Sequence, residues 1–377
     1  SGGVDSSAVA AIAVRSAASP RDIRTFNIAF EEAEFDESRY ARQVAEALGT
    51  DHHEMCLTES RFVADLAGAM NSIDQPTFDA INTYMVSKLV KEAGITVALA
   101  GTGGDELFGG YKSFVDLPKY RNWARGLNCI PKSISRTLAR RFIQWKTGST
   151  GDMPPQTRWG KMIDAIETGG QLLEFYQVAY GLFTRDFADR LTENGLMSHT
   201  HAGLSSDRAE NLRELIDGQE NLHAVSLLEL SLFLGDRLLR DTDAASMAVS
   251  LEVRVPLLDH EVVESIAGLQ TDVRFAPLGR KQLLRKLAFS ESMMPIFDRP
   301  KSGFVLPLDR WCRQGLKGEI AQTFNNAELC HRLGLNPDAI KLLWSGFESG
   351  APGLYWSRIW ALYVLLWWCE KHRVSMQ

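Results

Sequence analysis

Hydrophobic and polar positions in the first part of the chain alternate between strand-like and helix-like patterns. Short runs rich in apolar residues predict three strands, at residues 25–30, 51–56 and 95–100. Between them, apolar residues at helical spacing predict helices at residues 36–48 and 82–93, each closed by a glycine. The run 95–100 (ITVALA) begins with three β-branched residues and is mostly apolar, which is typical of a strand buried on both faces. This alternation predicts an α/β fold with a doubly wound parallel sheet.

From about Leu117 onward the pattern is mostly helical. A strongly apolar helix is expected at residues 227–239, and Asp259 is expected to cap a helix at residues 260–269. Residues 148–155 (GSTGDMPP) predict a loop or boundary. We therefore expect one unit over 1–377 in three segments: an α/β core (1–115), a helical segment (116–225) and a mostly helical segment (226–377).

The chain opens on a glycine-rich turn with no strand in front of it. The apolar run 8–14 predicts the first helix, with Ser6 or Ser7 near its N-cap. A glycine-rich turn that enters a helix normally follows a buried parallel strand, because the strand fixes the position of the loop. We therefore expect the first strand of the core to lie upstream, in a longer protein.

Composition excludes several classes of protein. The 377 residues are 45% hydrophobic and 23% charged, with a net charge of −6, so the whole molecule does not attract nucleic acid or anionic lipid. Residues 117–146 carry eight Lys and Arg and no acid, which indicates a solvated helical face, with a docking surface as the alternative. Five scattered cysteines without a C-x-x-C pair favour a reducing cytoplasm. The apolar run 359–369 is about half of a bilayer span and predicts a buried helix.

Residues 1–7 (SGGVDSS) have the composition of a phosphate-binding loop. Adjacent Gly2 and Gly3 let the backbone approach a phosphate, and the following helix directs its N–H groups at the anion. Hydroxyl donors can come from Ser1, Ser6 and Ser7. Asp5 would repel an anion unless a Mg²⁺ joins its carboxylate to the phosphate. The loop therefore predicts a site for Mg²⁺ and a nucleotide, with an ordinary Ser/Gly turn as the alternative.

A second acidic, glycine-rich loop spans residues 101–111 (GTGGDELFGGY), directly after the expected strand. It resembles a dinucleotide-binding fingerprint but has Glu106 at the third glycine position, and there is no Walker lysine. Loops at the carboxyl ends of neighbouring parallel strands converge where ligands bind. Asp5 and Asp105 are therefore expected to face each other across one Mg–ATP, with an acidic surface turn as the alternative.

The loop SGGVDSS resembles the pyrophosphate loop of the N-type ATP pyrophosphatases, which include asparagine synthetase, GMP synthetase, argininosuccinate synthetase and tRNA-modifying enzymes. Three further segments resemble the signature blocks of the synthetase domain of asparagine synthetase: 103–111 (GGDELFGGY), 250–260 (SLEVRVPLLDH) and 299–304 (RPKSGF). The resemblance runs to about Trp311. It implies an adenine nucleotide alpha hydrolase-like core with large helical additions. That family carries an N-terminal glutaminase domain, which these residues do not include.

The resemblance also implies roles for individual residues. ATP and Mg²⁺ would be the cofactors, with Asp5 and Asp105 as metal ligands and Asp105 also catalytic. Lys301 would reach the phosphates and stabilise charge on the departing pyrophosphate. Further nucleotide contacts would come from Ser1, Gly2, Gly3, Ser6, Ser7, Ile28, Gly101 and Gly103. The substrate would be bordered by Glu106, Glu252 and Arg254, although a structural ion pair explains the last two nearly as well.

The implied reaction is that of an AMP-forming carbon–nitrogen ligase. A substrate carboxylate attacks the α-phosphorus of ATP, giving an acyl-adenylate and pyrophosphate, and an amine then expels AMP. The leading hypothesis is asparagine synthesis from aspartate, with nitrogen from glutamine or ammonia. Its partners would be a small-molecule carboxylate and ammonia from an upstream glutaminase domain. The reaction would take place in the cytoplasm, and neither nucleic acid nor a membrane would take part. A homodimer is left open.

Some positions depart from the family pattern. Thr102 occupies a position where members commonly carry Glu or Asp, a candidate for the base of the second step, and its hydroxyl is far too weakly basic to replace a carboxylate. Ala100 replaces the usual serine, and Ala244 stands where Arg is common. These changes fall near the acceptor side and leave other carboxylates open, as in beta-lactam synthetases and macrolactam-forming enzymes. A tRNA-modifying enzyme and a non-catalytic homologue are further alternatives.

Overall fold

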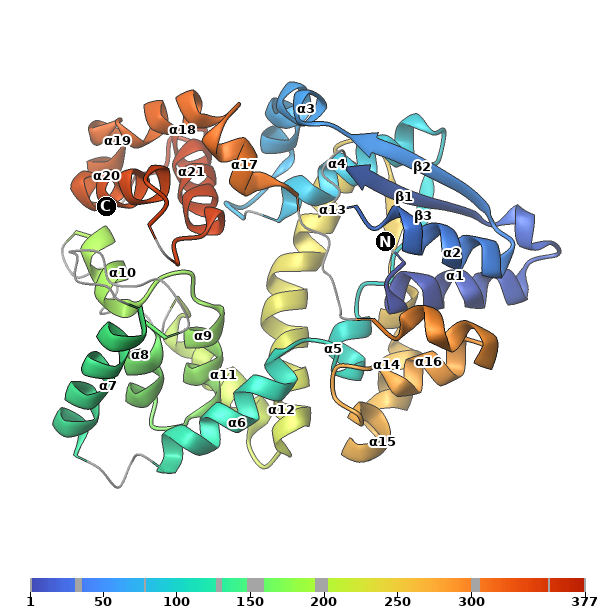
Figure 1. The fold of residues 1–377 in the computed structure, drawn as a ribbon, viewed down its shortest axis with the longest axis horizontal. Helices are drawn as coiled ribbons and strands as arrows, with labels where there is room; N and C mark the ends of the chain where they lie inside the picture. Colours follow the sequence, from blue (N-terminus) through green and yellow to red (C-terminus); the bar gives the residue numbers. More distant parts are fainter. Residues whose placement is uncertain are drawn as a thin grey trace. The chain divides into compact units, whose positions relative to one another are not determined.

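A computed structural model of the protein describes residues 2–30, 36–77, 79–126, 131–147, 159–193, 203–299, 306–351 and 353–375 (Figure 1). The chain folds into two compact units. Unit 1 comprises Ser1–Asp74, Asp79–Phe114 and Glu220–Pro307. Unit 2 comprises Gln75–Phe78, Val115–Gln219 and Leu308–Gln377. The loop expected at residues 148–155 lies outside the described residues.

Unit 1 contains two pairs of parallel strands. β1 (Arg24–Phe30) pairs with β2 (Asp51–Leu57), and β3 (Val97–Leu99) pairs with β4 (Glu252–Arg254). The three strands expected from the sequence are confirmed, and the short strand β4 joins them from far along the chain. The observed class is therefore α/β, mostly helical with small parallel sheets, while one continuous doubly wound sheet stays a prediction.

The strand β3 differs from its expected environment. The sequence predicts burial on both faces, but Val97 is 42% and Leu99 is 52% exposed. Both residues lie on the same side of the strand, since side chains alternate along it. In the described part of the chain β3 has a single strand neighbour, β4, so its other edge and part of this face adjoin an open cavity. The prediction of burial was wrong because nothing described fills that space.

The helices around β1 and β2 are α1 (Val4–Ser16), α2 (Ser38–Leu48), α3 (Glu59–Ser72) and α4 (Ala80–Glu92), and a short 3₁₀ turn η1 (Pro20–Asp22) precedes β1. Figure 1 shows α1 and α2 along one side of the two strands. The helices expected at 36–48 and 82–93 are confirmed, and α2 ends at Gly49 with φ +72°. The expected N-cap of α1 was wrong. The helix already begins at Val4 with Gly3 as its cap, since glycine is an acceptable cap, and Ser6 and Ser7 lie inside the helix.

The remaining elements of unit 1 are α5 (Gly104–Phe108), α12 (Asn221–Leu228), η4 (Glu229–Leu239), α13 (Arg240–Met247), η5 (Pro256–Leu258), α14 (His260–Ala267), α15 (Thr271–Phe275), α16 (Gln282–Ala288) and η6 (Glu291–Phe297). The apolar helix expected at 227–239 is present, but most of it, η4, is π-helical. The helix expected at 260–269 is α14, and Asp259 Oδ1 accepts the backbone N–H of Glu261 at 3.0 Å.

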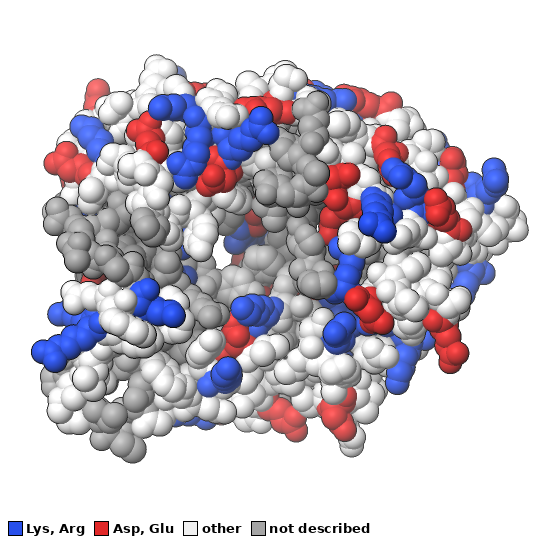
Figure 2. Space-filling view, in the orientation of Figure 1, with Lys and Arg blue, Asp and Glu red and all other residues white. Residues whose placement is uncertain are grey.

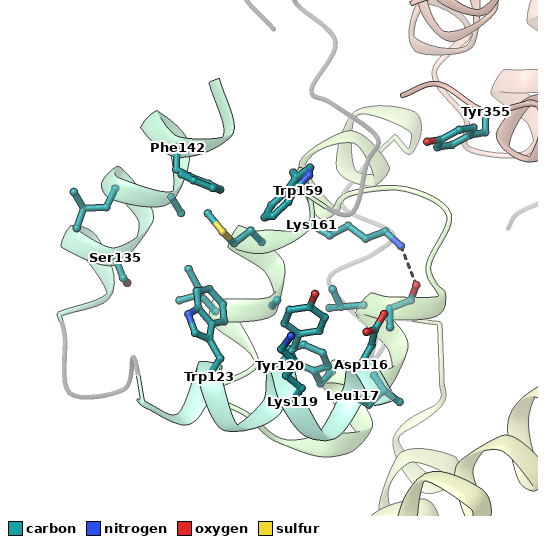
Figure 3. A pocket seen from close by; sticks show the side chains of 18 of the residues that line it. Asp116, Leu117, Lys119, Tyr120, Trp123, Ser135, Phe142, Trp159, Lys161 and Tyr355 are labelled. Carbon is teal, nitrogen blue, oxygen red and sulfur yellow. Dashed lines mark hydrogen bonds between the residues drawn. The ribbon is translucent and has the colours of Figure 1, made fainter. Parts of the chain in front are cut away.

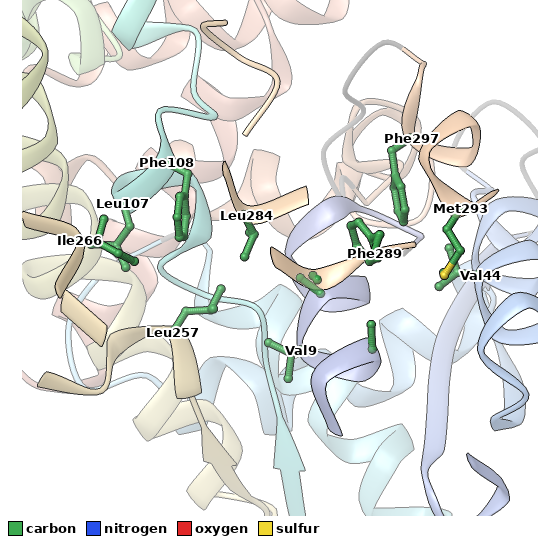
Figure 4. Close-up of a cluster of buried hydrophobic side chains, with 13 residues drawn as sticks. Val9, Val44, Leu107, Phe108, Leu257, Ile266, Leu284, Phe289, Met293 and Phe297 are labelled. Atoms are coloured by element: carbon green, nitrogen blue, oxygen red, sulfur yellow. The ribbon is translucent and has the colours of Figure 1, made fainter. Parts of the chain in front are cut away.

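One apolar cluster fixes the elements that later form the site. Figure 4 shows Val9 of α1, Phe108 of α5 and Leu284 of α16 within it. Leu284 is 2% and Phe108 is 1% exposed. Burying such side chains contributes about 1.5–3 kcal/mol each. The cluster therefore holds the starts of α1, α5 and α16 in fixed positions, although these helices lie far apart in the sequence.

Unit 2 is built from helices in the described residues: α6 (Ser113–Gly126, which starts in unit 1), α7 (Lys132–Thr147), α8 (Met162–Glu167), α9 (Leu172–Tyr180), α10 (Arg185–Leu191), α11 (Ser206–Ile216), α17 (Leu308–Arg313), α18 (Lys317–Phe324), α19 (Ala327–Arg332), α20 (Pro337–Glu348) and α21 (Trp356–Lys371). The buried helix expected at 359–369 is part of α21, where Trp360 is fully buried. Among the described helices, none combines the length and apolar character that a membrane crossing needs.

The basic stretch 117–146 makes ordinary intramolecular contacts. Arg136 forms an ion pair with Glu167 at 2.7 Å, and Arg121 Nε donates to the Gly170 carbonyl at 3.0 Å. Over the face in view in Figure 2, basic and acidic side chains are interspersed. These contacts favour the interpretation of this stretch as a partly paired, solvated face.

Candidate active site

A cavity of about 600 Å³ in unit 1 adjoins the starts of α1, α5 and α16. Its walls come from residues 2–6, 101–103, 105–106, 279–281 and Arg285, with Tyr111, Leu238 and residues 297–299 completing the lining. The volume is within the range of small-molecule sites. Both loops that the sequence analysis selected therefore open into one cavity.

Two carboxylates meet at one cation inside this cavity. Lys281 Nζ lies 2.6 Å from Asp105 Oδ1 and also contacts Asp5 Oδ2. Asp5 stands in the first turn of α1 and Asp105 in α5, so the two loops supply one carboxylate each. Because a single ammonium reaches both, Asp5 and Asp105 are close enough to share an ion.

Lys281 is the site residue that the sequence analysis missed. Its side chain is 5% exposed; burial opposes its charge, but Asp5 and then Asp105 outweigh burial and raise its pKa. Its backbone has φ +48°, in the left-handed region that residues other than glycine rarely adopt. Such strain is retained where surrounding contacts fix a residue. A lone lysine before a helix gives no sequence signal of this placement.

Buried polar contacts fix α5, the short helix that carries Asp105. Arg274 Nε donates to the Leu107 carbonyl at 2.7 Å, and its Nη2 donates to Ser226 Oγ at 2.8 Å. Ser226 Oγ in turn donates to the Glu106 carbonyl at 2.8 Å. Carbonyls at the end of a helix need such donors when they are buried. Asp105 is thus presented by a short helix whose last turn is held by two buried side chains.

Three glycines allow the close approach of the charged groups. A Cβ on Gly101 would overlap the backbone of Asp5 and Ser6, and one on Gly104 would overlap the Asp5 carboxylate. A Cβ on Gly110 would overlap both Asp105 Oδ1 and the Cε of Lys281. The glycines of the loop 101–111 therefore leave the room that the two aspartates and the lysine occupy.

The variant Gly110→Ala is expected to separate Asp105 from Lys281. The added methyl cannot be accommodated without moving one of the two side chains, which should cost about 1–3 kcal/mol of stability. Urea denaturation would measure this change. Gly318→Ala, in α18, is the matched control, since nothing lies within 4 Å of its Cβ position. Equal effects of the two substitutions would contradict the packing described here.

Glu106 lies in the same cavity wall as a buried carboxyl. It is 1% exposed, and Tyr111 Oη donates to its Oε1 at 2.9 Å. Burial raises the pKa of Glu106 to about 7, although hydrogen bonds from its own backbone and from Tyr111 oppose the rise. Burial likewise raises the pKa of Tyr111, so its hydroxyl remains a donor. Glu106 can therefore be neutral or charged near neutral pH.

This pKa predicts a pH-dependent stability. A folded-state pKa of about 7, against an ordinary 4.5, means that the folded protein holds this proton more tightly than the unfolded chain. Protonated Glu106 therefore adds about 3 kcal/mol to the free energy of unfolding. This stabilisation is complete below about pH 4.5 and is lost as pH rises through 7. Urea denaturation in EDTA across this range should show that Glu106→Gln removes this loss. The exposed Glu264→Gln should retain it; a Glu106→Gln curve parallel to the wild type would contradict the assignment.

Arginines surround the rest of the cavity. Arg285 donates to Asp298 Oδ1 at 2.8 Å and to the Met294 carbonyl at 2.9 Å. Arg299 donates to Glu37 Oε1 at 3.1 Å and to the Gly2 carbonyl at 3.3 Å, and so fixes the start of the first loop. With Arg280 these side chains line the same cavity as Lys281. The wall thus combines a pair of carboxylates with several cations.

These groups suit a divalent cation bound with a phosphate ester. Mg²⁺ prefers oxygen ligands and is usually bound by one or two carboxylates together with phosphate oxygens and water. Asp5 and Asp105 provide that pair, and the first turn of α1 with the arginines provides an anion site. Within the described residues no cluster of three or more His, Cys, Asp or Glu forms a metal cage. The donors therefore fit a metal that is held jointly by protein and nucleotide.

The residues expected at the site are distributed as follows. The cavity lining includes Gly2, Gly3, Asp5, Ser6, Gly101, Thr102, Gly103, Asp105 and Glu106. Ile28 and Ser7 line a neighbouring cavity that shares Gly2, Ser6 and Thr102 with the first. Glu252 and Arg254 form an exposed ion pair at 2.7 Å on β4 and are not among the described lining residues. Ser1 and Lys301 lie outside the described residues.

Comparison with known proteins places this geometry in context. Residues 1–370 match the family described as Asparagine synthase. A putative glutamine-hydrolyzing asparagine synthetase of Mycobacterium tuberculosis is 27% identical over 373 residues, which are 98% of this chain and 53% of that protein. Glutamine-hydrolyzing asparagine synthetase 1 of Bacillus subtilis is 27% identical over 86% of this chain and 48% of its own length.

A relative with a different name matches as well. A protein of Penicillium rubens named amidase chyE is 24% identical over 85% of this chain and 51% of its own length. The chain thus spans about half the length of the curated relatives that it matches. The names of these relatives differ, so the similarity supports the family and no particular substrate.

Proposed function

Because the chain belongs to the asparagine synthase family, we propose that it is the synthetase part of an AMP-forming carbon–nitrogen ligase, which activates a carboxylate with ATP and transfers the acyl group to an amine. One observation carries this proposal: Asp5 and Asp105, from separate loops, meet at a single cation in a cavity lined by arginines. That arrangement is what binding of a triphosphate through a shared metal requires.

In the first step the protein mainly binds and orients. The first turn of α1 and the glycines at 2 and 3 receive the phosphates, while Gly101 and Gly103 let the second loop approach the nucleotide. Bound Mg²⁺ would neutralise charge on the phosphate oxygens. Lys281, Arg285 and Lys301 would stabilise the negative charge that develops on the departing pyrophosphate. Most of the acceleration would then come from positioning and charge neutralisation.

Lys281 also has a role before the nucleotide binds. Its ammonium occupies the position between the two carboxylates, so Lys281 and a divalent cation compete for the same oxygens. Without either cation the two partly buried carboxylates would repel each other. We infer that Lys281 keeps the site assembled in the free protein and contacts phosphate oxygens once a metal takes its place.

For the second step we propose aspartate as the carboxylate and ammonia, derived from glutamine by an upstream glutaminase domain, as the amine. The product would be asparagine, formed in the cytoplasm. The threonine at position 102 cannot act as the base that the second step needs, so another carboxylate substrate, as in a specialised amidotransferase or lactam-forming enzyme, is the second candidate. Glu106, Glu252 and Arg254 are the proposed substrate contacts.

Exchange of labelled pyrophosphate into ATP tests the first step without the amine. With Mg²⁺ and aspartate the chain is expected to catalyse exchange, and adding ammonia should yield asparagine and AMP. Exchange with another acid but not with aspartate would select the second candidate. Absence of exchange with every carboxylate tried, in a protein that still binds ATP, would refute the proposal. Saturable tRNA binding that weakens steeply with salt would instead favour a tRNA-modifying enzyme.

A further inference from the structure

Unit 2 contains a cavity that is separate from the candidate active site. It has a volume of about 780 Å³ and lies between α6, α7, α8 and α9, with the start of α21 at one end. All of its described lining residues belong to unit 2, whereas those of the candidate active site belong to unit 1. The volume is within the range of small-molecule sites, so this cavity can hold a ligand of its own.

Aromatic side chains form much of the cavity wall. In Figure 3, Trp123 of α6, Phe142 of α7 and Trp159 point toward the same space from different parts of the chain. Trp123 is 42% and Phe142 is 38% exposed, and Leu138, one turn before Phe142, is 57% exposed. Neighbouring apolar side chains that stay accessible to water mark sites where an apolar group binds. The wall therefore suits an elongated apolar body.

The basic stretch 117–146 supplies both helices of this wall. The sequence left a docking surface open as an alternative for this stretch. Its apolar residues, rather than its cations, provide most of its contribution to the cavity, which comprises Leu117, Lys119, Tyr120, Trp123, Ser135, Leu138, Ala139 and Phe142. The stretch thus forms one side of a binding cavity in addition to a partly paired, solvated face.

Lys161 marks the polar end of the cavity. In Figure 3 its side chain extends away from the three aromatic rings, and its Nζ donates to the Ala179 carbonyl at 3.1 Å and also to the Gly181 carbonyl. Both carbonyls lie at the end of α9. These bonds use two of the three N–H groups of the ammonium. Within the described residues, the ammonium is thus fixed with one donor remaining for a ligand.

Arg358 and the start of α21 add positive charge at this end. Arg358 is 8% exposed and stands in the first turn of the helix. Tyr355, the N-cap, makes no side-chain capping hydrogen bond within the described chain, and the first turn carries no acidic residue. Both residues line the cavity. A helix start of this kind favours a nearby anion, through its N–H groups and its dipole.

The like charges at this end repel each other. Burial, and next the positive charge of Arg358, lower the pKa of Lys161 to about 8, although Asp164 opposes this shift. Burial likewise lowers the pKa of Arg358. Among the described lining residues, Lys119 is a third cation and Asp116 is the one carboxylate. A bound anion would relieve the repulsion, whereas a bound cation would add to it.

We propose that this cavity binds an anionic amphiphile, a carboxylate on an elongated apolar body. The aromatic wall holds the body, and Lys161 and Arg358 bind the carboxylate through charge-assisted hydrogen bonds. A carboxylate fits better than a phosphate ester, because its two oxygens and single charge match the remaining Lys161 donor and the Arg358 guanidinium. The site lies in unit 2, and the inference does not depend on the proposed ligase activity.

Calorimetry with three probes of equal chain length tests the choice of charge. The probes are decanoate, decanol and decyltrimethylammonium, each titrated into the whole chain at pH 7. Decanoate should bind at least about tenfold more tightly than decanol, because only the carboxylate gains charge-assisted hydrogen bonds. Decyltrimethylammonium should bind least, since it adds a further positive charge to the same end of the cavity.

Substitutions identify the cations responsible. Lys161→Met and Arg358→Met should each reduce the preference for decanoate over decanol, while decanol binds about as well as to the wild type. Lys341→Met, at an exposed position of α20, is the matched control and should retain the full preference. Melting temperatures of the variants show whether each one is folded before its affinities are compared.

Tryptophan fluorescence tests where the probe binds. A decanoate that carries bromine atoms along its chain quenches the tryptophans that it contacts. Replacing Trp123 and Trp159 together with phenylalanine should remove most of this quenching and keep the wall apolar. Trp367→Phe, on α21 and not among the described lining residues, is the matched control and should leave the quenching unchanged.

Three results would overturn the inference. The first is equal affinity of the wild type for the three probes, or no binding of decanoate, and neither outcome requires that a variant fold. The second is quenching that persists in the folded double tryptophan variant, which would place the bound chain elsewhere. The third is an unchanged preference for decanoate in both folded methionine variants, which would remove the two cations from the site.

Discussion

Replacing Asp105 with asparagine is expected to reduce pyrophosphate exchange by about 10²–10³-fold, the usual cost of losing one preorganised charged group at a reacting phosphate. Asparagine keeps the size of the side chain but removes the charge that holds a shared metal. The loss should persist when Mg²⁺ is raised, because the missing group is a ligand rather than a screening charge. Exchange rates at several Mg²⁺ concentrations measure both effects.

A matched control separates this effect from a general change in charge. Asp189, at the end of α10, is exposed, and Asp189→Asn should leave exchange unchanged. The melting temperature of Asp105→Asn should remain near that of the wild type, since Asp5 still accompanies Lys281. Full exchange activity in Asp105→Asn would remove this aspartate from the reaction.

Replacing Lys281 with methionine is expected to destabilise the metal-free protein by up to about 3 kcal/mol, below the full cost of breaking a buried ion pair because the two carboxylates left behind are only partly buried. Asp5 and Asp105 would then face each other without a cation. Millimolar Mg²⁺ should restore much of the loss, since a ligand that binds only the folded protein stabilises it. Thermal unfolding in EDTA and in Mg²⁺ measures the difference.

Lys286→Met, on the exposed face of the same helix, is the matched control for this variant. It should change stability little, and Mg²⁺ should not affect it more than it affects the wild type. A Lys281→Met protein that is destabilised equally with and without Mg²⁺ would mean that the two carboxylates do not bind the metal together.

The sequence predicted the elements that local patterns encode. Strand β1, helix α2 with its closing glycine and the Asp259 cap were all recognised from periodicity and capping residues. The two loops could also be selected. Their glycines suit the approach of a phosphate, and an aspartate in such a loop predicts a bound cation because it would otherwise repel the phosphate. That Asp5 and Asp105 lie close together followed from the rule that strand ends converge.

What the sequence could not predict depends on contacts between distant segments. Lys281 contacts Asp5, which lies 276 residues away in the sequence. The residues next to Lys281 in the sequence give no indication of this contact. The exposure of Val97 and Leu99 was missed because burial depends on a neighbour strand rather than on the residues themselves. The π-helical geometry of η4 likewise follows from packing, because its residues have an ordinary apolar pattern.

The most direct measurement is a crystal structure of the protein with Mn²⁺ and a non-hydrolysable ATP analogue, in which anomalous scattering locates the metal. We expect a single metal peak bound by oxygens of both Asp5 and Asp105 and by the phosphates, with Lys281 Nζ displaced toward the phosphate oxygens. A metal peak away from these two carboxylates, or a bound nucleotide with Lys281 still joining the aspartates, would contradict this expectation.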